Sequence, residues 1–203
     1  MPNRKTVVRT NSTSNSVKEV PLKVLTFQEL WNNYITGDPY DDPNGQYRNQ
    51  CAIRMSATFH RVGIEMKSFS QKLVKPMPGK PTLGRILLDG KSTATRAYEL
   101  AEWLKLRPIA GLPPPEHVTG SDWQSKVKGR AGIIFFYGYW RQDGDSADSF
   151  SGGHIDLWNG SRLTNNGALG TLETFARFTL NMRTGPGYSD LGESKQILFW
   201  EMN

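Results

Sequence analysis

The stretch Gly132-Ile-Ile-Phe-Phe-Tyr-Gly-Tyr-Trp140 is rich in β-branched and aromatic residues. Such residues favour extended backbone, because their side chains pack well on a pleated surface. Two shorter segments of similar composition follow at residues 154–158 and 196–201, separated from it by turn-rich sequence. We therefore predict three strands in the C-terminal part of the chain.

Upstream of these strands, apolar residues recur at helical spacing. Residues 26–34 place an apolar stripe on one helix face, and residues 94–105 do the same. A helical turn is expected near residues 121–123. Helices followed by strands predict an α+β fold. The length of 203 residues, without an internal linker or repeat, predicts a single domain over residues 21–203.

The first 20 residues are rich in Asn, Ser, Thr, Lys and Arg and contain no apolar stretch. We expect a flexible basic arm over residues 1–20, and we expect that the protein is made in the cytoplasm without a signal peptide. No run of apolar residues is long enough to cross a membrane, so membrane insertion is not expected. The formal net charge of +6 favours anionic surroundings. We expect no nucleic-acid partner, because the basic and aromatic motif of an RNA-binding sheet is missing.

Cys51 is the only cysteine, so it has no partner for an internal disulfide. Asn49 is a candidate N-cap, and small and apolar residues follow it at helical spacing, which puts Cys51 in the first turn of a helix. The amides and dipole at a helix start lower the pKa of a thiol and can bind an oxyanion. This position favours a nucleophile, while an inert core cysteine is the alternative.

His154 opens an alternating segment that is typical of a strand. His154, Asp156 and Trp158 are expected on one face, and Ile155 and Leu157 on the other. A histidine suits general base chemistry near neutral pH, and a hydrogen-bonded structural histidine is the alternative. The other two histidines, His60 and His117, fit a structural role.

The chain offers no motif for a metal or a cofactor. One cysteine and three scattered histidines lack the spacing of metal ligands. No glycine-rich segment has the spacing of a phosphate-binding loop. We therefore expect neither a metal nor a cofactor.

Four motifs occur together, in this order and at wide spacing: Phe27-Gln-Glu-Leu-Trp-Asn-Asn-Tyr34, Asn49-Gln-Cys-Ala-Ile-Arg-Met-Ser56, Ala101-Glu-Trp-Leu104 and Gly153-His-Ile-Asp-Leu-Trp-Asn-Gly160. Over roughly residues 24–200 they resemble the type VI secretion amidase effector family 4. The resemblance implies a papain-like, NlpC-type cysteine hydrolase fold, with the nucleophile at a helix start and the histidine on a C-terminal antiparallel sheet. It also implies cleavage of peptidoglycan stem peptides between D-glutamate and meso-diaminopimelate.

The resemblance further implies partners and a place of action. A cognate immunity protein would neutralise the enzyme, and the secretion machinery would inject it into the periplasm of a target bacterium. Its action there would be that of an antibacterial toxin that degrades the cell wall.

Carried onto this chain, the family pattern makes Cys51 the nucleophile and His154 the base. The family's third residue is an aspartate about a dozen residues after the histidine, where this chain has no carboxylate. Asn165 is our candidate there, and Asp156 is its rival, although two positions along one strand face are awkward for contact with His154. Arg54 would support the thiolate or bind a substrate carboxylate, with a surface ion pair as the alternative.

Gln50, next to the cysteine, is a further candidate for substrate contact. Two other functions remain open at this point. One is a papain-like acyltransferase, which uses the same thiol and imidazole. The other is a non-enzymatic basic binding module with a buried, inert Cys51.

Overall fold

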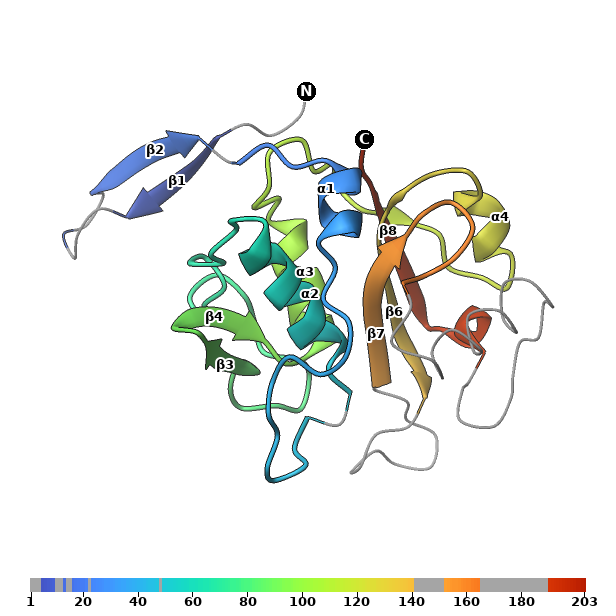
Figure 1. The fold of residues 1–203 in the computed structure, drawn as a ribbon, viewed down its shortest axis with the longest axis horizontal. Coiled ribbons are helices and arrows are strands. Elements are labelled where there is room, and N and C mark those ends of the chain that lie inside the picture. Colours follow the sequence, from blue (N-terminus) through green and yellow to red (C-terminus); the bar gives the residue numbers. More distant parts are fainter. Residues whose placement is uncertain are drawn as a thin grey trace.

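The computed structural model describes residues 5–9, 13, 16–21, 23–47, 49–140, 152–164 and 190–203. It shows a mixed α/β fold whose sheets are antiparallel (Figure 1). Within the described residues, no helix has the length and apolar character needed to cross a membrane. The elements, in chain order, are β1 (Lys5–Arg9), β2 (Val17–Pro21), α1 (Phe27–Asn32), α2 (Cys51–Arg61), β3 (Arg85–Leu88), β4 (Lys91–Ala94), α3 (Ala97–Lys105), β5 (Glu116–His117), α4 (Trp123–Val127), β6 (Gly132–Trp140), β7 (Gly152–Trp158), the 3-10 helix η1 (Leu191–Glu193) and β8 (Gln196–Glu201).

The four-stranded sheet has the order β5-β8-β6-β7, so that β7 lies at one edge. Both faces of this sheet are covered. Ile155 and Leu157 of β7 belong to the apolar cluster that includes α1, α2 and α3. Trp158 of the same strand belongs to a second cluster with α4 and η1. The predicted alternation of faces along β7 is therefore confirmed for these apolar residues.

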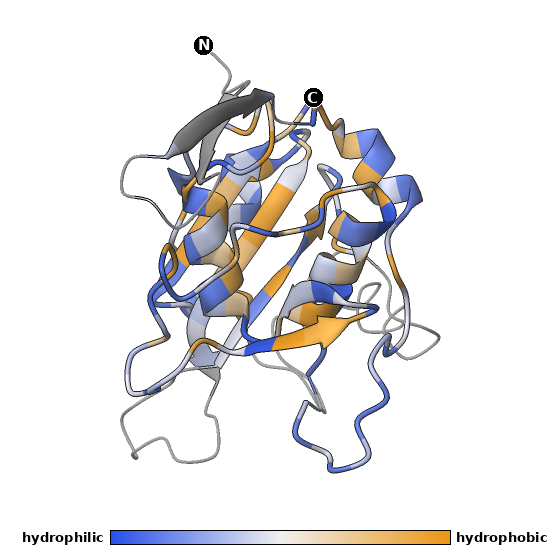
Figure 2. Ribbon diagram, turned by 90° about the vertical axis from the view of Figure 1, so that its left-hand side faces the viewer, coloured by the Kyte–Doolittle hydropathy of each residue, from blue (hydrophilic) through white to orange (hydrophobic). Residues whose placement is uncertain are grey.

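The three predicted C-terminal strands are confirmed. β6 and β8 have the predicted bounds, while β7 begins two residues before His154. The helical turn expected near residues 121–123 is the start of α4. Figure 2 shows that the helices carry both hydrophilic and hydrophobic residues.

The first predicted helix is α1, which is shorter than the expected 26–34. Its N-cap is Thr26, whose hydroxyl accepts a hydrogen bond from the Glu29 amide at 3.1 Å. The Phe27 amide donates to the Asn203 carbonyl at 3.0 Å, which ties this helix to the other end of the described chain.

The helix expected at residues 94–105 begins at Ala97, because Ala94 belongs to β4. β3 and β4 form an antiparallel hairpin that the sequence analysis missed. Its turn is Asp89-Gly90, with both residues at positive φ (49° and 74°). An Asp-Gly pair is a strong signal for a two-residue hairpin turn, but the sequence analysis predicts no strand on either side of it.

The segment expected to be a flexible arm contains the antiparallel pair β1 and β2, in which Lys5 lies opposite Pro21. Figure 1 shows this hairpin projecting beside the helical part of the molecule. The sequence had indicated no strand here. The division into an arm over residues 1–20 and a domain over residues 21–203 stays a prediction.

Candidate active site

Helix α2 starts beside β7, and this contact brings Cys51 and His154 together (Figure 1). Cys51 is the first residue of the helix and is only 5% exposed. Its thiol is hydrogen-bonded to the His154 side chain and to the backbone amide of Ile155. Because β7 is an edge strand, its outward-facing backbone amides can donate to a neighbouring group. The Ile155 amide donates to the Cys51 sulfur.

The predicted N-cap is wrong by one residue. Gln50, not Asn49, caps α2, and its side chain makes no capping hydrogen bond. The side chain of Gln50 is instead buried against the loop that precedes it. Its Nε2 donates to the Tyr40 carbonyl at 2.8 Å, and its Oε1 accepts from the Tyr40 amide at 3.1 Å. Gln50 therefore holds this loop in place, and contact with substrate stays a prediction.

Burial raises the pKa of the Cys51 thiol, but the surroundings outweigh it. The hydrogen bond to His154 and the charge of that residue, then the Ile155 amide and the Arg54 guanidinium, bring the pKa below its ordinary value. For His154, burial lowers the pKa, while hydrogen bonds to Asp156 and Cys51 raise it to about 9. Both shifts favour a thiolate paired with an imidazolium at neutral pH.

Asp156 contacts His154, contrary to the expectation that their spacing is awkward. The His154 Nε2 lies 3.3 Å from Asp156 Oδ2. Two residues span about 6.6 Å along a strand, a distance that an imidazole and a carboxylate on the same face can bridge together. Asn165, our first candidate for the third position, lies outside the described residues.

The other carboxylate oxygen of Asp156 is also engaged. Oδ1 accepts from the Leu157 amide at 2.8 Å and from the Thr164 hydroxyl. Asp156 is 1% exposed, so these donors compensate for the hydration that the carboxylate loses. The Thr164 contact was missed by the sequence analysis.

Arg54 lies one turn after Cys51 and is 9% exposed, so the ion pair given as the alternative forms with a buried arginine and an exposed aspartate. Its Nη1 donates to the Gly37 carbonyl and to Asp38 Oδ1, both at 3.1 Å. An ion pair does form, and the Arg54 charge also favours the thiolate.

Tyr34, which the sequence analysis placed only in the apolar stripe of residues 26–34, also lies beside the site. Its hydroxyl oxygen is buried beside the Thr164 hydroxyl. Burial, followed by the Asp156 charge, raises the pKa of Tyr34 well above its ordinary value, while the Thr164 hydroxyl lowers it. Tyr34 thus stays protonated beside the site.

The other two histidines lie away from this site. His60 Nε2 contacts the Ser92 carbonyl at 3.0 Å, and burial lowers the pKa of this histidine. His117 is exposed on β5. In the part of the chain that the structure describes, no group of three or more His, Cys, Asp or Glu side chains is placed to hold a metal ion.

Solved structures of type VI effectors share this fold. The chain is similar to the crystal structure of the type VI effector Tae4 from Enterobacter cloacae, with a TM-score of 0.54 and 16% identity over 91% of this chain and 100% of that one. It is also similar to the effector-immunity complex Tae4-Tai4 from Enterobacter cloacae, with a TM-score of 0.50 and 19% identity over 88% of this chain and 98% of that one.

Residues 47–200 match the family described as type VI secretion system (T6SS) amidase effector protein 4, Tae4. The chain belongs to this family, as the four sequence motifs predicted. No curated protein matches the chain.

Proposed function

We propose that this protein is a cysteine hydrolase that cleaves an amide bond of peptidoglycan stem peptides, with Cys51 as nucleophile and His154 as general base and acid. The observation that carries the proposal is the buried thiol of Cys51, hydrogen-bonded to His154 in a member of an amidase effector family. The shifted pKa values support an activated pair over an inert core cysteine.

In the proposed reaction, the Cys51 thiolate attacks the scissile carbonyl carbon and forms a tetrahedral intermediate. The His154 imidazolium gives its proton to the leaving amine as the carbon–nitrogen bond breaks, which leaves an acyl-enzyme thioester. His154, now neutral, takes a proton from water as the water attacks the thioester. The acid product leaves, and the thiolate and imidazolium are restored.

The start of α2 supplies donors for the oxyanion in this scheme. The first intrahelical bond runs from the Arg54 amide to the Gln50 carbonyl at 2.8 Å, so the amides of residues 51–53 precede the helical ladder. Donors aimed at the developing negative charge are worth about 3 to 4 kcal/mol each in acyl-transfer enzymes. We assign this role to the amides at the helix start.

We propose Asp156 as the group that orients the imidazole. Its contact with Nε2 supports this assignment and leaves Nδ1 as the nitrogen for the thiol. A buried carboxylate also stabilises the imidazolium more than an amide would, which favours Asp156 over Asn165. Since Arg54 already pairs with Asp38, we assign it to support of the thiolate.

The wider proposal rests on the family. We infer a papain-like, NlpC-type arrangement, with the nucleophile at the start of α2 and the histidine on β7. The bond that we propose is the one between D-glutamate and meso-diaminopimelate. The proposed setting is the periplasm of a target bacterium reached through the secretion machinery, and the proposed partner is a cognate immunity protein.

The test is digestion of purified muropeptides, with the products analysed by mass. The wild-type protein should release fragments cut after D-glutamate, and Cys51→Ala and His154→Ala should release none at equal concentration. His60→Ala is the matched control, because His60 lies away from the pair and should leave the products unchanged.

Two outcomes would overturn the proposal: no hydrolysis by the wild-type protein, or equal cleavage by Cys51→Ala. Transfer of the acyl group to an added amine without hydrolysis would instead assign the acyltransferase function. Slow alkylation of Cys51 with an ordinary thiol pKa would assign the inert cysteine of a binding module.

A further inference from the structure

The chain folds back on itself directly after β7. Asn159 Oδ1 accepts hydrogen bonds from the Ser161 amide at 3.0 Å and from the Arg162 amide at 2.9 Å. Gly160 between them has a φ of +94°, a value that a residue with a side chain rarely adopts. The turn pairs Trp158 with Leu163 in an antiparallel bridge. It therefore returns the next residue, Thr164, along β7 toward Asp156.

At this point Thr164 is 7% exposed, and its hydroxyl donates to Asp156 Oδ1. The Leu157 amide donates to the same oxygen, while Oδ2 faces His154. The two oxygens of the Asp156 carboxylate thus have different roles. One is fixed by two donors, and the other contacts the imidazole.

We infer that Thr164 is a positioning residue of the active site, whose hydroxyl holds the Asp156 carboxylate in the orientation that directs Oδ2 at His154. This inference rests on the proposed function of Cys51 and His154 and deepens it. Without the hydroxyl, Oδ1 keeps only the Leu157 amide, and the carboxylate gains freedom to rotate about its terminal bond. The imidazole then loses part of its orientation and of its stabilisation as a cation.

The other polar groups around the site do not replace this donor. Arg54 Nη1 donates to the Gly37 carbonyl and to Asp38, and among the described residues no hydrogen bond joins Arg54 to Asp156. The Tyr34 hydroxyl is buried beside Thr164 and Asp156, and among the described residues no hydrogen bond joins it to the Asp156 carboxylate. Thr164 is therefore the side chain that carries the contact.

The test compares Thr164→Val, which removes the hydroxyl at nearly constant volume, with wild type. A hydrogen bond to a charged group is worth enough to change a rate about tenfold or more, so kcat should fall by about that factor. KM should change little, because Thr164 is assigned no substrate contact. Thr93→Val is the matched control: it removes another buried hydroxyl, on β4, and should leave kcat unchanged.

A second pair of variants tests whether the valine variant loses activity only because it folds poorly. Thr164→Ser and Thr164→Ala both lose the methyl group, and only serine keeps the hydroxyl. Serine should retain most of the wild-type kcat, and alanine should behave like valine. Equal kcat in the serine and alanine variants would overturn the inference, as would a valine variant with wild-type kcat.

The rate of Cys51 alkylation by iodoacetamide provides a readout that needs no peptidoglycan. A weaker hold on the imidazolium should move the rise of this rate to higher pH in Thr164→Val, and Thr164→Ser should restore it. If the pH profile of alkylation is unchanged in Thr164→Val but shifted in His154→Ala, the positioning role of Thr164 is rejected and the cysteine–histidine pair is retained. An unchanged profile in His154→Ala as well would reject the pair itself.

Discussion

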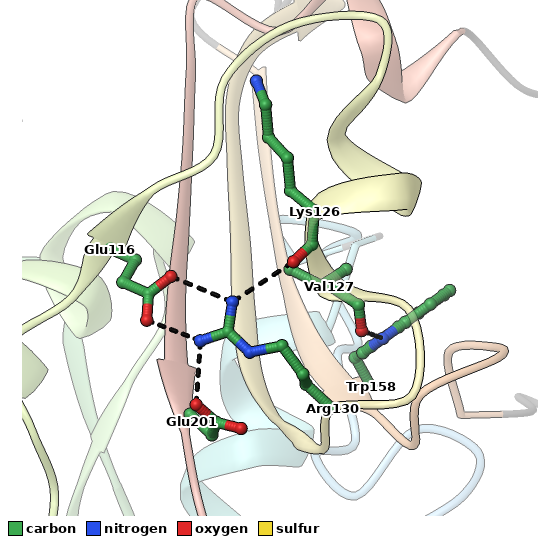
Figure 3. A network of polar contacts seen from close by, with 6 residues as sticks. All are labelled: Glu116, Lys126, Val127, Arg130, Trp158 and Glu201. Carbon is green, nitrogen blue, oxygen red and sulfur yellow. Dashed lines mark hydrogen bonds and ion pairs between the residues drawn. The ribbon is translucent and has the colours of Figure 1, made fainter.

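Two networks of charged side chains serve the same four-stranded sheet in different surroundings. In the site network, Asp156 is 1% exposed and His154 is 21% exposed. In the network around Arg130, the arginine is 26% exposed, and its partners Glu116 and Glu201 are 53% and 43% exposed (Figure 3). The first network is shielded from water on most sides, and the second is open to it.

The Arg130 network links segments that are far apart in the sequence. Its guanidinium donates to Glu116 on β5 and to Glu201 on β8, and it also reaches the Lys126 carbonyl at 3.2 Å. The same group lies 5.0 Å from the centre of the Phe199 ring. These contacts join the two strands to the end of α4.

The difference in burial separates a network that controls protonation from one that ties strands together. Charges interact more strongly where water is excluded, so the buried carboxylate of Asp156 can hold a proton on His154. Water and salt screen the same type of contact around Arg130. Substitutions in the first network should therefore affect the reaction, and those in the second should affect only stability.

The largest expected effect is that of Asp156→Asn. The amide keeps the size of the side chain but removes the charge, and an equivalent change in a Ser-His-Asp enzyme costs about 10⁴-fold in kcat. Because a thiolate is a better nucleophile than an alcohol, we expect a loss of about 10²-fold to 10⁴-fold here. Steady-state kinetics on a purified stem peptide would measure it.

Asn165→Ala is the comparison for this variant. If Asp156 orients the imidazole, the alanine variant should keep most of its kcat. A severe loss in Asn165→Ala together with mild loss in Asp156→Asn would transfer the role to the position that the family pattern indicates.

The next effect concerns pH. The pKa of Cys51 is lowered, so the thiolate forms as pH rises through a value below the ordinary thiol range. The pKa of His154 is raised to about 9, so the imidazolium is lost as pH rises through that value. Activity should therefore increase along the acid limb and decrease near pH 9. Values of kcat/KM across this range would test the profile.

Asp156→Asn should shift the basic limb of this profile to lower pH, because the imidazolium loses a stabilising charge. An identical profile in the two proteins would mean that the buried network does not control the protonation of His154. Such a result would mean that the buried network around Asp156 and the exposed network around Arg130 do not differ in their control of protonation.

Much of the fold followed from local patterns in the sequence. The strands β6 and β8 are rich in apolar and aromatic residues and are buried on both faces of the sheet, so composition alone located them. The hairpin of β3 and β4 is shorter. Residues of β3 alternate between exposed and half-buried, and those of β4 do not alternate in burial. There the Asp89-Gly90 pair was the signal for a hairpin turn, but the helix expected from residue 94 overlapped the end of the second strand.

For the candidate site, the motifs supplied Cys51 and His154 but not the geometry between them. That geometry depends on α2 packing beside the edge strand β7, a long-range contact that residue spacing does not reveal. The contact of Asp156 depends on side-chain orientation within one strand. The contribution of Thr164 depends on a turn at Asn159-Gly160. The sequence shows the turn-forming residues, but it does not show that the turn leads the chain back along β7.

The smallest expected effect is that of Arg130→Met, which keeps an apolar side chain near Phe199 and removes the charge. The partners Glu116 and Glu201 are exposed enough to regain water, so the free energy of unfolding should fall by about 1 kcal/mol or less. Urea unfolding at low and high salt would measure it, and the difference from wild type should shrink as salt screens the pairs. The kcat should stay at the wild-type value. A loss above about 3 kcal/mol, insensitive to salt, is typical of a broken buried ion pair and would show that the two networks differ less than their exposure indicates.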